Sequence, residues 1–227
     1  MPAADHAGTL ALTLATASLL RREMPQVPSF TLVPHKVSTR VTDPIVSPLA
    51  AIGITPNMIS VFGFSGNLLA ACLAAGGHFL AAGIVMLIAS GLDLLDGALA
   101  RKTGRVTVFG GVFDSVLDRL SEAAVLAGLL FHYTQIGGHV QEILLIYAAV
   151  VGSILVSYVR ARAEADGIAL REGLFTRAER VLLLGIALIV SHGAVPVALW
   201  ILAVLSNFTA GQRVYVVWQR LREEGRA

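Results

Sequence analysis

Charged residues and cysteine are both scarce in this chain of 227 residues. Only 14% of the residues are Asp, Glu, Lys or Arg, whereas a soluble domain carries about 25%. The hydrophobic share of 56% excludes an ordinary soluble globular protein and an intrinsically disordered chain. The single cysteine, Cys72, excludes a scaffold that is held together by disulfides. An integral membrane protein is the class that remains.

Long apolar runs, separated by short polar or glycine-containing turns, fill most of the chain. Each run is close to the length of about 20 residues that a helix needs to cross a bilayer. We therefore predict an all-α fold, a membrane bundle of six transmembrane helices, over these runs: Met58–Ala75, Phe79–Ala100, Gly111–Phe131, Ile143–Tyr158, Val181–Ser191 with its flanks, and Val195–Val217. Thr55 is expected to cap the first helix, with Pro56 in its first turn.

The N-terminal region is expected to lie on the membrane or to be disordered. Its apolar run Gly8–Leu20 is too short to span and has no basic segment before it, which argues against a signal peptide. Thr39–Ala51 is predicted to be an interfacial helix, with Lys36 and Arg40 facing anionic head groups. The predicted organisation is thus an N-terminal segment over 1–35, one six-helix domain over 36–222 and a short tail over 223–227.

All seventeen lysine and arginine residues lie at one set of helix ends or before the first helix. The turns at Gly76, Gly137 and Gly193 contain none of them. The positive-inside rule therefore predicts a multi-pass protein of the cell membrane with both termini in the cytoplasm. Since topology explains the basic residues, no nucleic-acid partner is expected. The opposite ends carry four histidines, which we interpret as interfacial polar residues rather than metal ligands: His78, His132, His139 and His192.

Four aspartates lie in or at the cytoplasmic ends of the second and third predicted spans, where charge exposed to lipid is costly. Asp93 and Asp96 are three residues apart and Asp114 and Asp118 are four apart, so each pair projects from one helix face. The short connection makes the two helices antiparallel neighbours. Carboxylate oxygens without imidazole or thiolate favour Mg²⁺ or Mn²⁺, and this donor set suits two ions about 4 Å apart.

Buried salt bridges to Arg101, Arg105 and Arg119 are an alternative explanation of the aspartates. Gly97 and Ala100 favour a ligand site, because they remove side-chain bulk where a ligand would approach. Close helix packing would explain these two small residues equally well.

An ion pathway is an alternative of a different class, because intramembrane carboxylates on facing helices also mark such pathways. A cation transporter would need the path to continue toward the other side of the membrane. The outer half of the second span, Phe79–Leu92, offers no ionisable group for this purpose, which argues against transport.

The aspartates belong to a longer run of residues with fixed spacing. It reads Asp93-Leu-Leu-Asp96-Gly97-Ala-Leu-Ala100-Arg101, then eight residues, Gly110, three residues, Asp114, three residues and Asp118. This run resembles the signature of the CDP-alcohol phosphatidyltransferase family at every defined position. The resemblance covers the chain from about Lys36 to Arg222 and implies an enzyme in which an alcohol displaces CMP from a CDP-linked lipid.

The resemblance also implies roles for individual residues. Asp93, Asp96, Asp114 and Asp118 would be metal ligands, and Asp118 would also be the base that takes the proton from the acceptor hydroxyl. Six residues are expected to contact the CDP part of CDP-diacylglycerol: Asn57, Ser60, Gly97, Ala100, Arg101 and Thr107. The resemblance further implies a homodimer.

A second basic cluster bears on the acceptor. Ser157–Glu164 ends the fourth predicted span and Arg177–Arg180 opens the fifth, and together they carry an excess of about two positive charges, which suits a phosphorylated acceptor. These segments, with Asp118–Glu122, resemble the phosphatidylinositol phosphate synthases, except that Arg160 stands where those enzymes usually have lysine. The resemblance implies that five arginines surround the acceptor phosphate: Arg160, Arg162, Arg177, Arg180 and Arg213.

The sequence therefore predicts a membrane transferase that moves a phosphatidyl group from CDP-diacylglycerol to a phosphorylated polyol and releases CMP. Inositol phosphate is the expected acceptor, and the active site is expected to face the cytoplasm. Glycerol 3-phosphate is the alternative acceptor, because its phosphate would use the same arginines.

Overall fold

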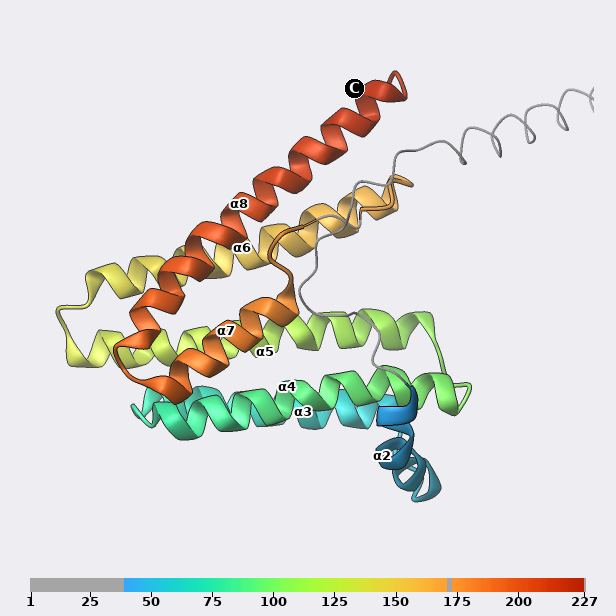
Figure 1. The fold of residues 1–227 in the computed structure, drawn as a ribbon, viewed down its shortest axis with the longest axis horizontal. Coiled ribbons are helices and arrows are strands. Elements are labelled where there is room, and N and C mark those ends of the chain that lie inside the picture. The colour runs from blue at the N-terminus through green and yellow to red at the C-terminus, as the bar shows by residue number, and fades with distance from the viewer. Residues whose placement is uncertain (1–38, 171–172, 227) are drawn as a thin grey trace, which may run out of the picture.

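The computed structural model describes residues 39–170 and 173–226, and in these residues the chain forms seven helices and no strand (Figure 1). The all-α prediction is confirmed for this part of the chain. The helices are α2 (Thr39–Ala51), α3 (Pro56–Ala75), α4 (Phe79–Lys102), α5 (Val108–Ile136), α6 (Val140–Ala165), α7 (Arg177–Val190) and α8 (Ala194–Glu223). The predicted N-terminal segment 1–35, with its run Gly8–Leu20, lies outside the described residues.

Four of these helices, α3, α4, α6 and α8, are long and apolar enough to cross a membrane. This supports a multi-pass membrane protein. The other two predicted spans, α5 and α7, differ from an ordinary apolar transmembrane helix, each for its own reason. α5 carries charged residues over its first half, and α7 has only 14 residues. At 1.5 Å per residue α7 is roughly 21 Å long, against a hydrocarbon core of about 30 Å.

The start of α3 and the turn between α4 and α5 follow directly from local sequence. Thr55 Oγ1 accepts a hydrogen bond from the Met58 amide and Pro56 stands at the first helical position, as predicted. After α4 the chain turns at Gly104, whose φ of 66° is the left-handed conformation that glycine adopts without strain. Thr107 then caps α5 by accepting a hydrogen bond from the Gly110 amide at 3.0 Å. The short turn places the ends of α4 and α5 that carry aspartates side by side.

The helices pack in two groups. α3 packs closely against α4 and α5, α6 packs along α8, and α7 lies against α4. Figure 1 shows α6 and α8 running together toward the C-terminus, away from the group of α3, α4 and α5. The central core contains large apolar side chains from both groups, among them Leu126, Leu129, Ile146, Leu184 and Leu199.

Small residues let the helices approach closely at several points. A Cβ atom on Gly128 of α5 would lie 2.2 Å from the Ala71 carbonyl oxygen of α3. A Cβ atom on Gly152 of α6 would lie 2.8 Å from the Ser206 Cβ of α8. Inside a bilayer the hydrophobic effect does not drive helices together. Glycine at such positions supports their association because it allows the two backbones to pack closely.

Helix α2 covers the end of α4 that follows the aspartates. Its Val46 is buried against α3 and α4, in a small apolar cluster with Ile59, Ala98 and Leu99. Lys102 Nζ donates a hydrogen bond to Ser47 Oγ at 2.5 Å. The helix predicted over Thr39–Ala51 is therefore present and is fixed to the bundle at the same end as the charged turn.

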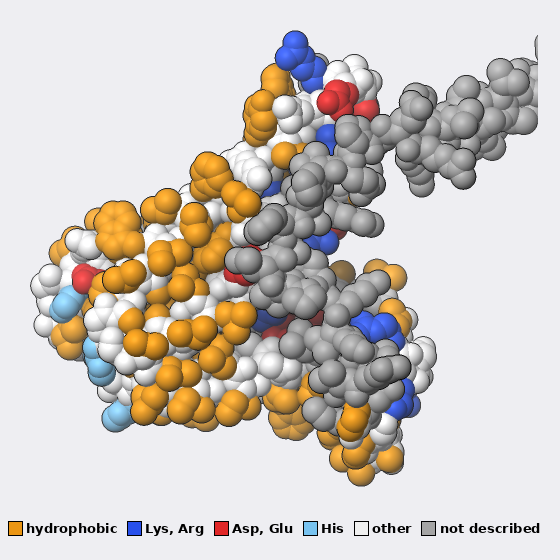
Figure 2. Space-filling model, viewed as in Figure 1, with side chains coloured by type: hydrophobic (Ala, Val, Ile, Leu, Met, Phe, Trp, Pro, Cys, Tyr) orange, Lys and Arg blue, Asp and Glu red, His pale blue; other side chains and the backbone are white. Residues whose placement is uncertain are grey.

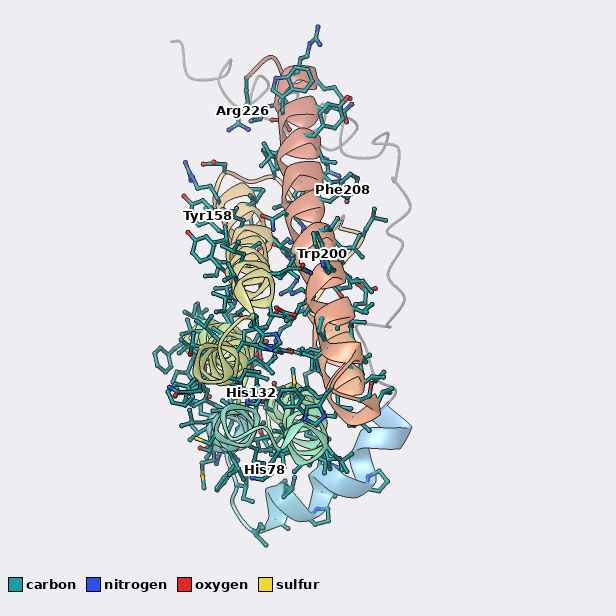
Figure 3. The ribbon with its side chains drawn as sticks, turned by 90° about the vertical axis from the view of Figure 1, so that its left-hand side faces the viewer. His78, His132, Tyr158, Trp200, Phe208 and Arg226 are labelled. Carbon is teal, nitrogen blue, oxygen red and sulfur yellow. The ribbon has the colours of Figure 1, made fainter. Side chains whose placement is uncertain are left out.

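The surface repeats the charge pattern of the sequence. Figure 2 shows hydrophobic side chains over the middle of the molecule, histidines at its left edge, and basic side chains at its right edge and on the upper arm. Phe79 stacks on His192 with ring centroids 4.5 Å apart and meets the edge of His132 at 4.9 Å. Figure 3 views the molecule from this end, with His78 and His132 labelled. At this end His139 lies 5.1 Å from the Tyr133 ring and 3.4 Å from Glu142.

Candidate active site

Aspartates of α4 and α5 come together between the two helices. Asp93 of α4 and Asp118 of α5 both contact the guanidinium of Arg177, so these two carboxylates lie on the facing sides of the two helices. The antiparallel arrangement expected from the spacing is therefore present. No three His, Cys, Asp or Glu side chains among the described residues are grouped so as to hold a metal ion.

Arg177, from the first turn of α7, lies between two of these aspartates. Its Nη2 contacts Asp93 Oδ2 at 2.9 Å, and its Nη1 contacts Asp118 Oδ1 at 2.6 Å. The guanidinium neutralises part of the acidic charge, which explains how the carboxylates remain close together. Asp93 and Asp118 are therefore salt-bridged, as the alternative explanation supposed, but among the described residues their partner is Arg177 and not Arg101, Arg105 or Arg119.

Helix α3 supplies the third wall of the site. Ser60 Oγ donates a hydrogen bond to Asp96 Oδ2 at 2.6 Å, and both side chains are buried. A Cβ atom on Gly63 would lie only 2.4 Å from Asp93 Oδ1, so glycine leaves the space that this carboxylate occupies. Ser60 was predicted to contact the CDP group, and the structure places it directly on an aspartate.

The remaining predicted CDP contacts lie around the start of α5 and the end of α4. A Cβ atom on Gly110 would lie 2.9 Å from Thr107 Oγ1 and 3.5 Å from Asn57 Oδ1, so these three residues are neighbours. A Cβ atom on Gly97 would lie 3.4 Å from Arg101 Nη1. Ala100, one residue before Arg101, is half-buried, and the Arg101 side chain is exposed.

The five predicted acceptor arginines fall into two groups. Arg160 and Arg162 are exposed on α6 and pair with acids of their own helix or its cap, Glu164 at 2.9 Å and Asp166 at 3.0 Å. Three others point into the bundle: Arg177, Arg180 and Arg213. The structure therefore brings Arg177 to the aspartates and does not join all five arginines in one cluster.

Arg180 and Arg213 are almost completely buried. The Arg180 guanidinium forms two hydrogen bonds with Glu122 of α5, at 2.6 and 2.9 Å, and one with Ser153 of α6 at 3.0 Å. Arg213 Nη1 donates to the Val156 carbonyl oxygen at 2.5 Å. A Cβ atom on Gly173 would come within 2.8 Å of Arg213 Nη2, so this glycine lets the loop before α7 rest on the guanidinium.

Three residues of this site were not predicted from the sequence: Gly63, Glu122 and Ser153. Glu122 follows Asp118 by four residues, and this spacing places it one turn further along the same face of α5. That spacing could have identified it. Gly63 and Ser153 lie within apolar runs and carry no local signal that separates them from packing residues.

The sequence profile of the CDP-alcohol phosphatidyltransferase family matches residues 53–210, which include all four aspartates. The chain belongs to this family. It is therefore an enzyme of the CDP-alcohol phosphatidyltransferase class, and the family resemblance found in the sequence is confirmed.

Relatives named archaetidylinositol phosphate synthase and phosphatidylinositol phosphate synthase are similar to this chain over most of their length. An archaetidylinositol phosphate synthase of Pyrococcus horikoshii is 40% identical over 82% of this chain and 97% of its own. A phosphatidylinositol phosphate synthase of Mycobacteroides abscessus is 34% identical over 82% of this chain and 87% of its own.

Solved structures of the Mycobacterium tuberculosis phosphatidylinositol phosphate synthase have the same fold. The structure with CDP-DAG bound is 34% identical, covers 79% of this chain and 94% of its own, and has a TM-score of 0.71. The structure in complex with manganese and citrate covers 78% of this chain and 88% of its own, with 34% identity and a TM-score of 0.73.

Proposed function

We propose that this phosphatidyltransferase moves the phosphatidyl group of CDP-diacylglycerol to inositol phosphate and releases CMP. The observation that carries the proposal is the position of Arg177, which contacts Asp118 at 2.6 Å. An arginine from the predicted acceptor cluster thus adjoins the carboxylate that we assign as the base. Relatives named for inositol phosphate products, with either archaetidyl or phosphatidyl lipid, support the same acceptor.

The donor set fits a divalent metal ion. Asp93, Asp96, Asp114 and Asp118 offer only carboxylate oxygens, the ligands that Mg²⁺ and Mn²⁺ prefer, and the manganese in a related structure supports the assignment. We propose that the four aspartates hold two ions. Bound metal would offset the charge of the donor pyrophosphate and of the departing CMP.

The protein's own residues then position the reactants. Asp118 would accept the proton of the acceptor hydroxyl as that oxygen attacks the phosphorus of the lipid phosphate. Arg101 would place a planar cation beside the pyrophosphate. The neighbouring Asn57, Thr107 and Gly110 would form the polar border for the cytidine end, with Ser60, Gly97 and Ala100 nearby. Such positioning and charge complementarity supply most of what phosphoryl transfer requires.

The acceptor phosphate is assigned to the arginine side of the site. Arg177 is closest to the aspartates, and we place Arg160, Arg162, Arg180 and Arg213 around the route from the cytoplasm. Glycerol 3-phosphate is the second candidate acceptor, because charge alone does not distinguish it from inositol phosphate.

The proposed setting is the cytoplasmic face of the cell membrane. Six spans from α3 to α8 would place both termini and the aspartates on that face, in agreement with the distribution of lysine and arginine. Residues 36–222 would form the catalytic domain, with 1–35 as an N-terminal segment and 223–227 as a tail. We further propose a homodimer, as the family resemblance implies.

Release of CMP by the purified full-length protein tests the acceptor. CDP-diacylglycerol would be supplied with inositol phosphate, inositol, glycerol 3-phosphate or serine, in parallel reactions. We expect release with inositol phosphate that exceeds the reactions with inositol and serine by at least about 100-fold, because an unpaired phosphate site rejects alcohols without a phosphate. The reaction with glycerol 3-phosphate decides between the two phosphorylated acceptors. Activity with free inositol or serine alone would contradict a phosphorylated acceptor.

Replacing Arg177 is expected to strengthen metal binding. In Arg177→Gln the guanidinium no longer competes for Asp93 and Asp118, and we expect Mn²⁺ to bind about 10-fold more tightly, which corresponds to about 1.4 kcal/mol. Calorimetric titration of the protein in nanodiscs measures this directly. Arg226→Gln, at an exposed pair with Glu224, is the matched control and should leave the affinity unchanged. Unchanged or weaker binding in Arg177→Gln would contradict the competition.

A further inference from the structure

A buried ion pair joins α5, α6 and α7 next to the aspartates. Arg180 Nε and Nη2 donate to the two oxygens of Glu122 at 2.6 and 2.9 Å. Ser153 Oγ donates to Glu122 Oε2 at 2.9 Å and accepts from Arg180 Nη2 at 3.0 Å. Arg180 is 2% exposed and Glu122 is 4% exposed. Both oxygens of the carboxylate are therefore engaged within the protein, and neither faces solvent.

The position of this pair in the two helices relates it to the site. Glu122 lies one turn after Asp118 on α5, and Arg180 lies about one turn after Arg177 on α7. Two ion pairs of equal length, 2.6 Å each, therefore connect α5 and α7 one above the other: Asp118 with Arg177, and Glu122 with Arg180. Because the second pair is buried and bidentate, it determines where the first turn of α7, and thus Arg177, stands.

The buried pair of Glu122 and Arg180 is poorly explained by a contribution to stability alone. Desolvation of two charges offsets most of their attraction, and well-packed apolar residues in their place often serve stability as well or better. A bidentate pair does define orientation, because the planar guanidinium fits the carboxylate in one arrangement. Removing the charge of one partner leaves the other buried without compensation, so the remaining group must turn away.

We propose that Glu122, together with Ser153, is a positioning residue of the acceptor site. It contacts no substrate and acts through Arg180, whose fixed orientation sets the position of Arg177 beside Asp118. The inference deepens the proposed function and rests on it, because it assumes that the arginines of α7 receive the phosphate of the acceptor. It adds to the enzyme a residue that lies outside the family signature.

The test is Glu122→Gln in the full-length protein, reconstituted in nanodiscs. Glutamine keeps the shape and loses the charge, so Arg180 is no longer held by two charged hydrogen bonds. We expect the KM for inositol phosphate to rise about 10-fold or more, as the loss of a hydrogen bond to a charged group implies. The KM for CDP-diacylglycerol should stay within about twofold, since its contacts lie on α3, α4 and the start of α5.

Glu142→Gln is the matched control. This acid also lies on a helix and pairs with a neighbour, His139, but at the opposite end of the bundle. It should change neither KM. A purely structural role of Glu122 would lower the yield of folded protein without separating the two KM values. An unchanged acceptor KM in Glu122→Gln, or an equal rise in both KM values, would overturn the proposal.

Ser153→Ala keeps the proposal testable if Glu122→Gln does not fold. It removes only the hydroxyl that bridges Glu122 and Arg180, and we expect the acceptor KM to rise about fivefold, less than in Glu122→Gln, because the two hydrogen bonds between Arg180 and Glu122 remain. No change in Ser153→Ala would count against the proposal. If the wild-type protein releases CMP with another acceptor and not with inositol phosphate, the proposed acceptor is wrong, and the same KM comparison is then made with the acceptor that it uses.

Discussion

Asp118→Asn is expected to reduce CMP release by at least about 100-fold, with inositol phosphate as acceptor. General-base catalysis contributes about 10² to 10⁴ in rate, and asparagine cannot accept the proton. The variant also loses one of the two carboxylates that Arg177 contacts. The measurement is the initial rate of CMP release by protein that elutes as a single folded species. Glu224→Gln, an exposed acid at the C-terminal end, is the control for loss of a negative charge.

Stability and activity should separate in this variant. Four carboxylates held together repel one another, so an uncharged residue at position 118 is expected to leave the unfolding temperature unchanged or raised. This trade is common where a site concentrates like charges for function. An inert scaffold predicts the stability result alone, with no loss of activity. Full CMP release in folded Asp118→Asn would refute Asp118 as the base.

Gly128→Ala is expected to destabilise the protein by about 1 to 3 kcal/mol, the usual cost of overpacking a close contact. The added Cβ would lie 2.2 Å from the Ala71 carbonyl oxygen and 2.9 Å from its carbonyl carbon. Both are backbone atoms of α3, so the helix must move as a whole. Because α3 carries Ser60 and Gly63, we also expect activity to fall in the protein that remains folded.

Gly211→Ala on α8 is the matched control for this change. An added Cβ there meets nothing within 4 Å, and alanine favours a helix over glycine by up to about 1 kcal/mol. Thermal unfolding in detergent, followed by the fraction of protein that stays soluble and monodisperse, compares the two variants. Equal stability of Gly128→Ala and Gly211→Ala would contradict the close contact between α3 and α5.

Much of the fold follows from the sequence because membrane helices obey simple length and polarity constraints. The ends of α3 were predictable from Thr55, Pro56 and the Gly76-Gly77 turn, which are local signals. α5 and α7 were harder. Their runs suggested ordinary spans, but α5 carries its charges into a protein interior and α7 ends after 14 residues. Hydropathy does not distinguish a helix that faces lipid from one that lines a polar site.

The residues of the site also divide into those that the sequence predicts and those that it does not. Asp93, Asp96, Asp114 and Asp118 were predictable, since their spacing on two antiparallel helices determines which faces they share. The partner of Asp93 and Asp118 was not, because Arg177 lies 84 residues beyond Asp93 and reaches the site only through the packing of α7 on α4. Arg119, a salt-bridge candidate close in sequence, donates instead to the Ser115 carbonyl oxygen of its own helix.

The shortness of α7 has a consequence for how two unlike substrates meet. With its far end at the turn that carries His192, a helix of roughly 21 Å leaves its first turn about 9 Å short of the opposite edge of a hydrocarbon core of about 30 Å. In the proposed orientation Arg177 and its neighbours therefore lie below the level of the lipid head groups. In that orientation water would have to reach this depth of the inner leaflet, so that a soluble acceptor could meet the phosphorus of a lipid that stays in the bilayer.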